Sequence, residues 1–201
     1  IRQTDMRRII DLTFASLSLI VLSPIFLVVA ICAKLQSPGP TFYKSQRAGQ
    51  HGITFEMYKF RTMVENADSF GQELTAYRDP RITPIGSFLR RWKLDEIPQL
   101  INIIKGEMSI IGPRPESPYY VQYYTQNQRQ ILQILPGITG PSQFANRNEE
   151  EKLKGKPNPE QFYIDTLMPE KLQIDLEYIK RRNCYSDMLW VIRTILGIIL
   201  Y

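Results

Sequence analysis

LTFASLSLIVLSPIFLVVAICA, residues 12–33, is the stretch that decides the fold. It carries no charged side chain, and 17 of its 22 residues are apolar. A helix that crosses the hydrocarbon core of a bilayer needs roughly 20 such residues, so the stretch predicts insertion into a membrane. A cleaved signal peptide is the alternative. The run is long for one, and no cleavage site of small residues follows it.

Ser23 and Pro24 lie at the middle of this run. Proline lacks a backbone donor and clashes with the carbonyl four residues earlier, so we expect a sharp kink. The Ser23 hydroxyl can satisfy a carbonyl that the kink frees. Each half would be about 16 Å long, roughly half of the hydrocarbon core, and could enter one leaflet and return.

Positive charge flanks the run on both sides, which suits two ends in the cytoplasm. The flanking cations are Arg2, Arg7, Arg8, Lys34, Lys44 and Arg47. These residues alone leave a re-entrant hairpin and a slightly kinked transmembrane helix about equally open.

Composition narrows the class of protein further. The chain has 201 residues, 43% apolar and 22% charged, which fits one folded domain and excludes wholesale disorder. Its net charge of +5 favours acidic partners such as phosphates, nucleotides, anionic lipids or nucleic acid. His51 is the single histidine, so a zinc site rich in His and Cys is not available. Two cysteines give no disulfide framework, and a reducing compartment fits.

Local signals predict the elements after the membrane run. Residues 41–47 and 54–61 read as a β-hairpin around Gly49 and Gly52, with Lys59 and Arg61 on the face of Phe55 and Met57. The other expected elements are helices over 87–93, 98–105 and 119–135, a rigid loop over 112–115, a polar loop over 146–160, a helix from Pro169, and an apolar terminal helix over 188–201 that lies either in a membrane interface or on the core.

The densest set of charged residues runs from Arg90 to Arg114. Asp95 and Glu96 come just before Pro98, which predicts a helix start where both carboxylates can turn toward one site. Two carboxylates beside phosphate-binding cations suit Mg²⁺, which takes few carboxylates and completes its shell with substrate oxygens. Acids that merely stabilise the helix dipole are the alternative. The set comprises Arg90, Arg91, Lys93, Asp95, Glu96, Lys105, Glu107 and Arg114.

Arg114 stands between Pro113 and Pro115, so its cation is carried by a stiff loop. A stiff loop loses little entropy when it binds, which suits a diphosphate or a nucleobase. Lys59 and Arg61 are candidates for the same anion. For all three cations, exposure to solvent without a ligand is the alternative. No P-loop and no G-x-G-x-x-G supports ATP or dinucleotide use.

Five short blocks, in this order and spacing, resemble the bacterial sugar transferase family, the monotopic polyprenyl-phosphate phosphoglycosyl transferases. The blocks are YKFRTM at 58–63, LDEIPQL at 94–100, KGEMS at 105–109, GPRPE at 112–116 and PGITG at 136–140. The match extends over nearly the whole chain and includes the Ser-Pro pair of the membrane run. Any one block would be weak evidence, whereas five in order are specific.

The resemblance implies an α+β fold in two parts. Residues 1–36 would form a re-entrant membrane hairpin. Residues 37–201 would form a small, mostly helical cytosolic catalytic domain with a short β-hairpin, membrane-interface helices and a C-terminal interfacial helix. The protein would lie on the cytoplasmic face of the bacterial inner membrane.

The resemblance also implies a reaction. A sugar-1-phosphate would pass from a UDP-sugar to a polyprenyl phosphate such as undecaprenyl phosphate, with release of UMP, as the first membrane step of glycan assembly. Asp95 would be the nucleophile that forms a phosphosugar-aspartyl intermediate, and Glu96 would bind Mg²⁺. The implied substrate contacts are Arg90, Arg114 with Pro113 and Pro115, Lys59, Arg61 and, more weakly because Asn146 stands where a glycine often precedes the arginine, Arg147.

Two competing interpretations use the same charge. A membrane-anchored adaptor with a basic surface would bind anionic lipid, but it does not explain Asp95 and Glu96 between arginines. A nucleic-acid-binding protein lacks a basic-aromatic recognition module, so we expect no nucleic-acid partner. Homo-oligomer formation is compatible with the sequence. The sugar, the lipid length, the pathway and the choice of Mg²⁺ over Mn²⁺ are not fixed by these residues, and Ile1 leaves open where the natural chain begins.

Overall fold

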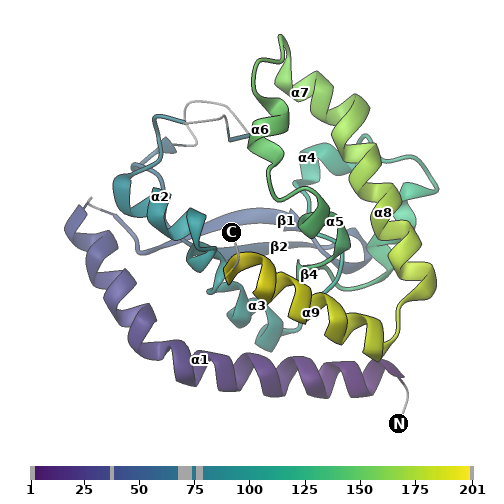
Figure 1. Ribbon diagram of the computed structural model, residues 1–201, viewed down its shortest axis with the longest axis horizontal. Helices are drawn as coiled ribbons and strands as arrows, with labels where there is room; N and C mark the ends of the chain where they lie inside the picture. Colours follow the sequence, from purple (N-terminus) through teal and green to yellow (C-terminus); the bar gives the residue numbers. More distant parts are fainter. Residues whose placement is uncertain (1–2, 37–38, 68–73, 76–78, 200–201) are drawn as a thin grey trace.

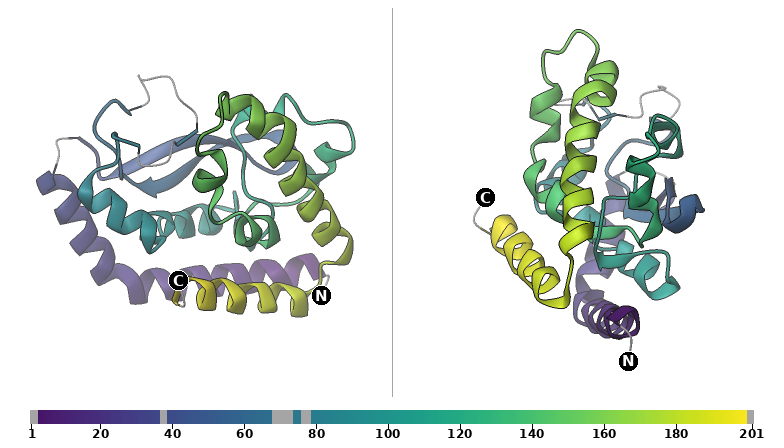
Figure 2. Two further views of the ribbon diagram at one scale, coloured as in Figure 1. Left: turned by 45° about the horizontal axis from the view of Figure 1, so that its top comes forward. Right: turned by 90° about the vertical axis from the view of Figure 1, so that its right-hand side faces the viewer.

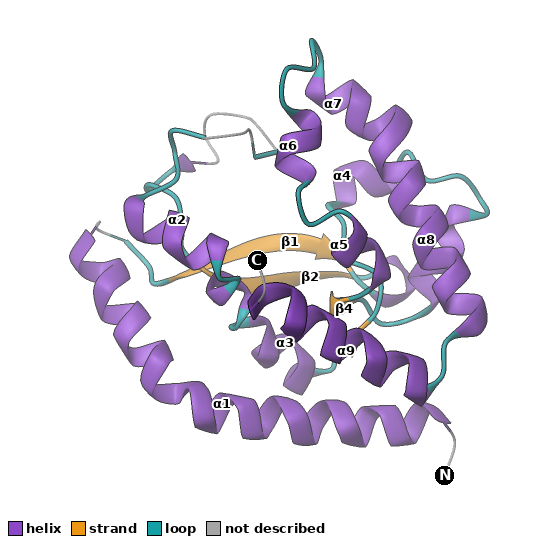
Figure 3. Cartoon of the chain, in the orientation of Figure 1, coloured by secondary structure: helices purple, strands orange, loops and turns teal. Residues whose placement is uncertain are grey.

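The computed structural model describes residues 3–36, 39–67, 74–75 and 79–199, and the side chains of these residues except 3–5, 35–36 and 198–199. Short strands lie at the centre and helices surround them (Figures 1 and 3). The sequence predicts a long apolar N-terminal helix followed by a mixture of helices and strands, and this prediction is confirmed. The helices are α1 (Gln3–Gln36), α2 (Pro84–Arg91), α3 (Gln99–Lys105), α4 (Pro118–Val121), α5 (Pro141–Ala145), α6 (Glu149–Leu153), α7 (Pro159–Phe162), α8 (Met168–Arg181) and α9 (Cys184–Ile199).

Helix α1 contains the apolar run and bends about halfway along its length (Figure 1). Pro24 lies inside it and cannot donate to the Ile20 carbonyl oxygen. The Ser23 hydroxyl donates to that same oxygen at 2.7 Å, as the sequence predicts. Residues Met6–Lys34 form the one helix of the described chain that is long and apolar enough to cross a membrane.

Polar side chains attach the first half of α1 to the rest of the molecule. The Arg8 guanidinium donates to the Ile103 and Ile104 carbonyl oxygens at 2.6 and 3.0 Å. Asp11 accepts from the Ile110 backbone N–H at 3.0 Å, and Arg7 pairs with Asp187 of α9 at 3.2 Å. The flanking cations Arg7 and Arg8 therefore have specific partners in the domain, whereas Arg2 lies outside the described residues.

Strands β1 (Phe42–Ala48) and β2 (Thr54–Phe60) form the predicted antiparallel hairpin to within one residue, with Phe42 opposite Phe60 and Arg47 opposite Phe55. One face of β2 packs Phe55 and Met57 against α3 and Ala15 of α1. Phe60 contacts α1 and α2 residues.

A second, parallel strand pair was not expected from the sequence. Strand β3 (Ser109–Ile111) pairs with β4 (Gly137–Thr139), so that Ser109 faces Gly137 and Ile111 faces Thr139. Three-residue strands give no usable periodicity, and this pairing joins segments far apart in the chain. Residues 112–115, directly after β3, form a loop as predicted.

The helix predicted over 119–135 is wrong. The chain forms only α4 and the 3₁₀ helix η4 (Gln128–Gln133). Between them, the Thr125 N–H donates to the Gln128 side chain at 2.8 Å and the Gln128 N–H donates to the Thr125 hydroxyl at 3.3 Å. These reciprocal bonds resemble a capping box and replace the hydrogen bonds of a continuous helix.

Three other boundaries differ from expectation. Helix α2 begins at Pro84 rather than at 87, because the Thr83 hydroxyl accepts from the Gly86 N–H and caps it. The segment 146–160 is not one loop, since α6 buries Leu153 and α7 begins at Pro159. From α7 the chain continues helically through the π-turn η5 (Tyr163–Leu167) into α8, whose Leu172 and Leu176 are buried as expected.

Helix α9 begins beside the N-terminal end of α1, where Arg7 pairs with Asp187 (Figure 2). Its Trp190 and Val191 pack on the core, and its Thr194 hydroxyl shares a 2.8 Å hydrogen bond with Thr139. Its other side exposes a row of apolar side chains, namely Tyr185, Met188, Leu189, Ile192, Ile195 and Leu196. The helix therefore has both a core-packed face and an exposed apolar face.

Candidate active site

A tight reversal of the chain presents Asp95 and Glu96. Helix α2 ends at Arg91, and Lys93 adopts a left-handed conformation with φ 56°. The next three residues form the 3₁₀ turn η3 (Leu94–Glu96), and Pro98 then caps α3. The two carboxylates thus lie ahead of a helix and outside it, as the position of Pro98 predicts.

Glu96 is held by two cations from different parts of the chain. Its Oε1 accepts from Lys59 Nζ at 3.2 Å and from Arg114 Nη2 at 2.8 Å. Burial raises the pKa of the Glu96 carboxyl, but the attraction of Arg114 and Lys59 outweighs burial and leaves that pKa well below its ordinary value. Glu96 is therefore ionised across the physiological pH range.

Asp95 has a different environment although it is the adjacent residue. It is only 6% exposed, and its buried Oδ1 makes no hydrogen bond in the described structure. Burial, followed by repulsion from Glu96, raises the pKa of the Asp95 carboxyl. A desolvated carboxylate oxygen without a partner is a reactive group, because little has to be removed from it before it attacks an electrophile or binds a cation.

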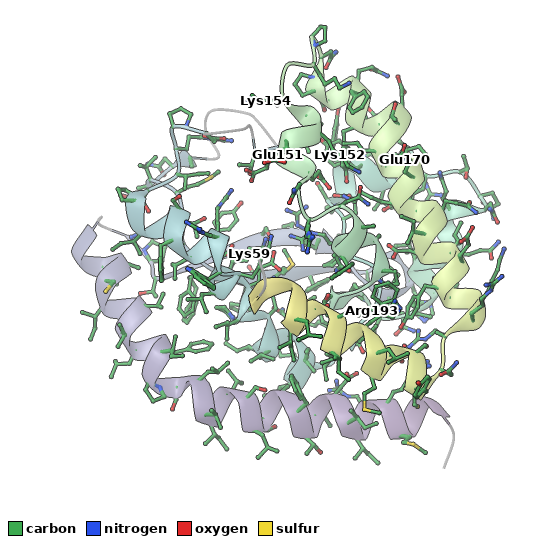
Figure 4. All side chains as sticks on the ribbon, viewed as in Figure 1. Lys59, Glu151, Lys152, Lys154, Glu170 and Arg193 are labelled. Carbon is green, nitrogen blue, oxygen red and sulfur yellow. The ribbon has the colours of Figure 1, made fainter. Side chains whose placement is uncertain are left out.

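Lys59 belongs to β2 and is labelled near the middle of the view in Figure 4. Burial lowers the pKa of its ammonium to about 8, against the opposing attraction of Glu96. Its contact with Glu96 places this predicted site residue beside the carboxylate pair.

Arg90 lies in the last turn of α2, and its positive charge attracts the Asp95 carboxylate. Its Nε donates to the Thr62 hydroxyl at 3.0 Å, and its Nη1 lies 3.5 Å from Glu150 of α6. Part of the stretch predicted as a solvated loop therefore supplies an acidic side chain to one of the predicted substrate cations.

The loop that carries Arg114 is fixed at its start by β4. The Gly112 N–H donates to the Thr139 oxygen at 3.0 Å, and the Gly137 N–H donates to the Pro113 oxygen at 2.8 Å. A Cβ on Gly137 would lie 2.1 Å from the Gly112 nitrogen, so this approach requires glycine. Pro113 and Pro115 are buried, which supports their predicted role in stiffening the loop.

Other predicted residues lie elsewhere. Arg61 donates to the Ala33 oxygen at the end of α1, at 3.4 Å. Arg147 is exposed and stacks on Phe144 at 5.4 Å. Lys105 contacts Tyr58, away from the carboxylate pair. Substrate contacts by Arg61 and Arg147 stay predictions.

Asn102 is a site-supporting residue that the sequence analysis missed. It is fully buried, accepts from the Tyr58 N–H at 3.0 Å and donates to Glu56 O and Glu107 Oε2, both at 2.7 Å. It thereby fastens β2, next to Lys59, to the helix that follows Glu96. The signal that the sequence offered was the polar side chain of Asn102 between Ile101 and Ile103 in a short apolar helix.

The carboxylate pair fits a hard divalent cation only together with substrate oxygens. The described residues contain no group of three or more His, Cys, Asp or Glu side chains arranged to hold a metal. Asp95 nevertheless offers an unpartnered buried oxygen beside an ionised Glu96. Mg²⁺ is commonly bound by one or two carboxylates plus substrate phosphates, so the donor set is compatible with it.

An apolar cavity of about 390 Å³ lies between α2 and the second half of α1. Its walls are Val28, Val29 and Cys32 from the second half of α1 and Ile85, Phe88 and Leu89 from α2. The same helix carries Arg90 in its last turn, so an apolar space and a cationic end belong to one short element.

The family model for bacterial sugar transferases matches residues 2–200. This chain belongs to the bacterial sugar transferase family. The predicted family and the prediction of a transferase are thereby confirmed. This sugar transferase is 37% identical to the exopolysaccharide production protein ExoY of Sinorhizobium fredii, over 94% of this chain and 83% of that protein.

Two further relatives have names that state a reaction. The UDP-glucose:undecaprenyl-phosphate glucose-1-phosphate transferase of Escherichia coli is 35% identical over 94% of the sugar transferase chain and 39% of its own length. The UDP-N-acetylgalactosamine-undecaprenyl-phosphate N-acetylgalactosaminephosphotransferase of Aeromonas hydrophila is 32% identical over 94% of the chain and 43% of its own length. The chain thus spans less than half of these two relatives.

Proposed function

We propose that this protein transfers a sugar-1-phosphate from a UDP-sugar to polyprenyl phosphate, giving a polyprenyl-diphosphate-sugar and UMP. The observation that carries the proposal is the asymmetric carboxylate pair: a buried Asp95 without a hydrogen bond on Oδ1, beside a Glu96 neutralised by Lys59 and Arg114. Names of relatives that act on UDP-sugars and undecaprenyl phosphate support it.

The transfer would take two displacements at one phosphorus. An Asp95 carboxylate oxygen attacks the phosphorus that bears the sugar, a P–O bond forms, and the anhydride bond to UMP breaks. An oxygen of polyprenyl phosphate then attacks the same phosphorus, and the bond to Asp95 breaks, which restores the carboxylate. Covalent catalysis of this kind lets the small product leave before the bulky lipid reacts.

The cations around the pair would overcome the repulsion between a carboxylate and a diphosphate. Arg90 and Arg114 would hold the phosphates and the uridine part, with Lys59 close by. Glu96 would hold Mg²⁺, with Asp95 adjacent. When bound, Mg²⁺ would neutralise charge on the diphosphate and on the leaving UMP.

The membrane would supply the second substrate. We propose that α1 is a re-entrant anchor with both ends on the cytoplasmic side of the bacterial inner membrane, and that the exposed apolar face of α9 lies in the interface. The isoprenoid chain of the lipid would occupy the cavity between α1 and α2, because that cavity is apolar and α2 ends in the cationic Arg90. This reaction would be the first membrane step in the assembly of a bacterial glycan.

The experiment is UMP release from a panel of UDP-sugars, with undecaprenyl phosphate and Mg²⁺, for wild type, Asp95→Asn and the control Asp165→Asn. Asp165 is exposed, and its carboxylate accepts hydrogen bonds from the exposed Gln161 side chain. Release with one sugar, lost in Asp95→Asn and kept in Asp165→Asn, is the expected result and identifies the sugar. No release from any sugar, or unchanged release in Asp95→Asn, contradicts the proposal.

A further inference from the structure

Glu116, two residues after Arg114, is held by contacts from two separate elements, β1 and η5. Its Oε2 accepts a hydrogen bond from the Tyr163 hydroxyl, and Arg47 of β1 lies 3.8 Å from its Oε1. Its backbone oxygen accepts from the Ala48 N–H at 2.9 Å. The loop that carries Arg114 is therefore fixed at its end as well as at its start.

Tyr163 is built into the core and cannot reach a ligand itself. It is 1% exposed, and its ring packs on Tyr120 with centroids 4.9 Å apart. Its hydroxyl donates to Glu116 and accepts from Lys171 Nζ at 2.9 Å. Both hydrogen-bonding capacities of the oxygen are thus used on charged partners, which fixes its position.

The negative charge of Glu116 also acts on Arg114 within the same loop. Attraction to Glu96, and more weakly to Glu149 and Glu116, raises the pKa of Arg114. The Arg114 guanidinium therefore already feels the Glu116 charge. Without the Tyr163 hydroxyl, the Glu116 carboxylate would keep its Oε1 contacts with Arg47 and the Ser117 N–H, but the end of the Arg114 loop would lose its tie to η5.

We propose that Tyr163 is a positioning residue for the nucleotide site: by holding Glu116, it fixes the loop that presents Arg114. The inference rests on the proposed function, in which Arg114 binds the UDP part of the donor. It assigns a role in donor recognition to the helical stretch of η5 and α8, far from Arg114 in the sequence.

The test is the affinity for UDP, measured by calorimetry on the full chain in detergent, for wild type, Tyr163→Phe and Tyr178→Phe. Tyr178 is the matched control, because it is also buried, lies in α8, and donates to a carboxylate, that of Asp187, at 2.6 Å. We expect UDP binding to weaken about tenfold in Tyr163→Phe and to change less than twofold in Tyr178→Phe. Equal effects in the two variants would mean a general loss of core stability and would overturn the proposal.

A double-mutant cycle tests whether Tyr163 acts through Glu116. In a Glu116→Ala background, adding Tyr163→Phe should leave UDP affinity unchanged, whereas a further tenfold loss would contradict the proposed route. If wild type and Tyr163→Phe bind UDP with the same affinity, the positioning role alone is overturned. Wild type that binds no UDP would refute the proposed function together with the role built on it.

Discussion

Two adjacent carboxylates acquire different properties from their surroundings. Glu96 has two direct cationic partners, so the pKa of its carboxyl is lowered, whereas Asp95 lacks a partner on Oδ1 and has a raised pKa. Pairs of titratable groups whose pKa values are pushed apart divide roles between themselves. We expect Glu96 to remain a charged ligand and Asp95 to be the group that reacts.

The pKa of Lys59 predicts a pH dependence of donor binding. Because that pKa is about 8 rather than 10.5, the ammonium loses its charge as the pH rises through 8. A neutral Lys59 attracts the diphosphate less, so the KM for the UDP-sugar should rise between pH 7 and 9, by roughly threefold to tenfold. The measurement is the pH profile of KM in wild type and in Lys59→Arg, which stays charged. The same rise in both proteins would contradict the assignment to Lys59.

Helix α1 shows what a Ser-Pro pair does within an apolar element. Proline removes the donor for the Ile20 oxygen, and the Ser23 hydroxyl replaces it, so the bend leaves that oxygen satisfied. A bend with a satisfied backbone is what a re-entrant anchor requires.

Replacing Ser23 and Pro24 together by alanine should straighten α1 and move one flank across the bilayer. The measurement is accessibility of a single cysteine placed before residue 6, in a background with Cys32 and Cys184 changed to serine. Ser16→Ala with Ser18→Ala is the control, because it removes two hydroxyls and keeps the Ser-Pro pair. Labelling from the cytoplasmic side in all variants would count against the kink as the cause of the topology.

The cavity between α1 and α2 is the proposed site of the lipid chain, so a side chain that fills it should weaken lipid binding selectively. Both valines are exposed, but Val28 lines the cavity between the two helices and Val21 does not, so Val28→Trp fills part of the cavity and Val21→Trp places the same ring outside it. We expect Val28→Trp to raise the KM for polyprenyl phosphate at least fivefold and to leave the KM for the UDP-sugar unchanged. Equal lipid KM values for the two variants would show that the chain binds elsewhere.

Elements with local signals were predictable, and elements formed by distant pairing were not. The hairpin and α3 follow from alternation, Pro98 and Gly106, all of which act within a few residues. The β3–β4 pair depends on Ser109 meeting Gly137, and no local pattern shows this. The structure brings Lys59 and Arg114 to Glu96, next to Asp95, whereas the site roles of these residues stay predictions. The support of Asn102, Glu116 and Tyr163 is tertiary and could not be found from one sequence.

At the scale of the whole molecule, α1 and the domain are one packed unit along the first half of the helix (Figure 2). Arg7, Arg8 and Asp11 make polar contacts with α9, α3 and β3. The proposed catalytic residues are therefore held at a fixed distance from the helix that would lie in the membrane.

Asp11→Ala should destabilise the protein, because it leaves the buried Ile110 N–H without an acceptor, at a cost of about 1–3 kcal/mol. The measurement is thermal unfolding in detergent, with Asp165→Ala as the control at an exposed carboxylate. A midpoint several degrees lower is expected for Asp11→Ala only. Equal midpoints would mean that α1 contributes little to the stability of the domain.

The most direct test of Asp95 as the nucleophile is a single-turnover reaction without the lipid. Enzyme is mixed with UDP-sugar labelled in the sugar-bearing phosphate, and UMP and protein-bound label are measured together. We predict a burst of about one UMP per active enzyme and an equal amount of hydroxylamine-sensitive label on Asp95, both absent in Asp95→Asn. UMP that appears only after polyprenyl phosphate is added, with no label on the protein, would contradict the account.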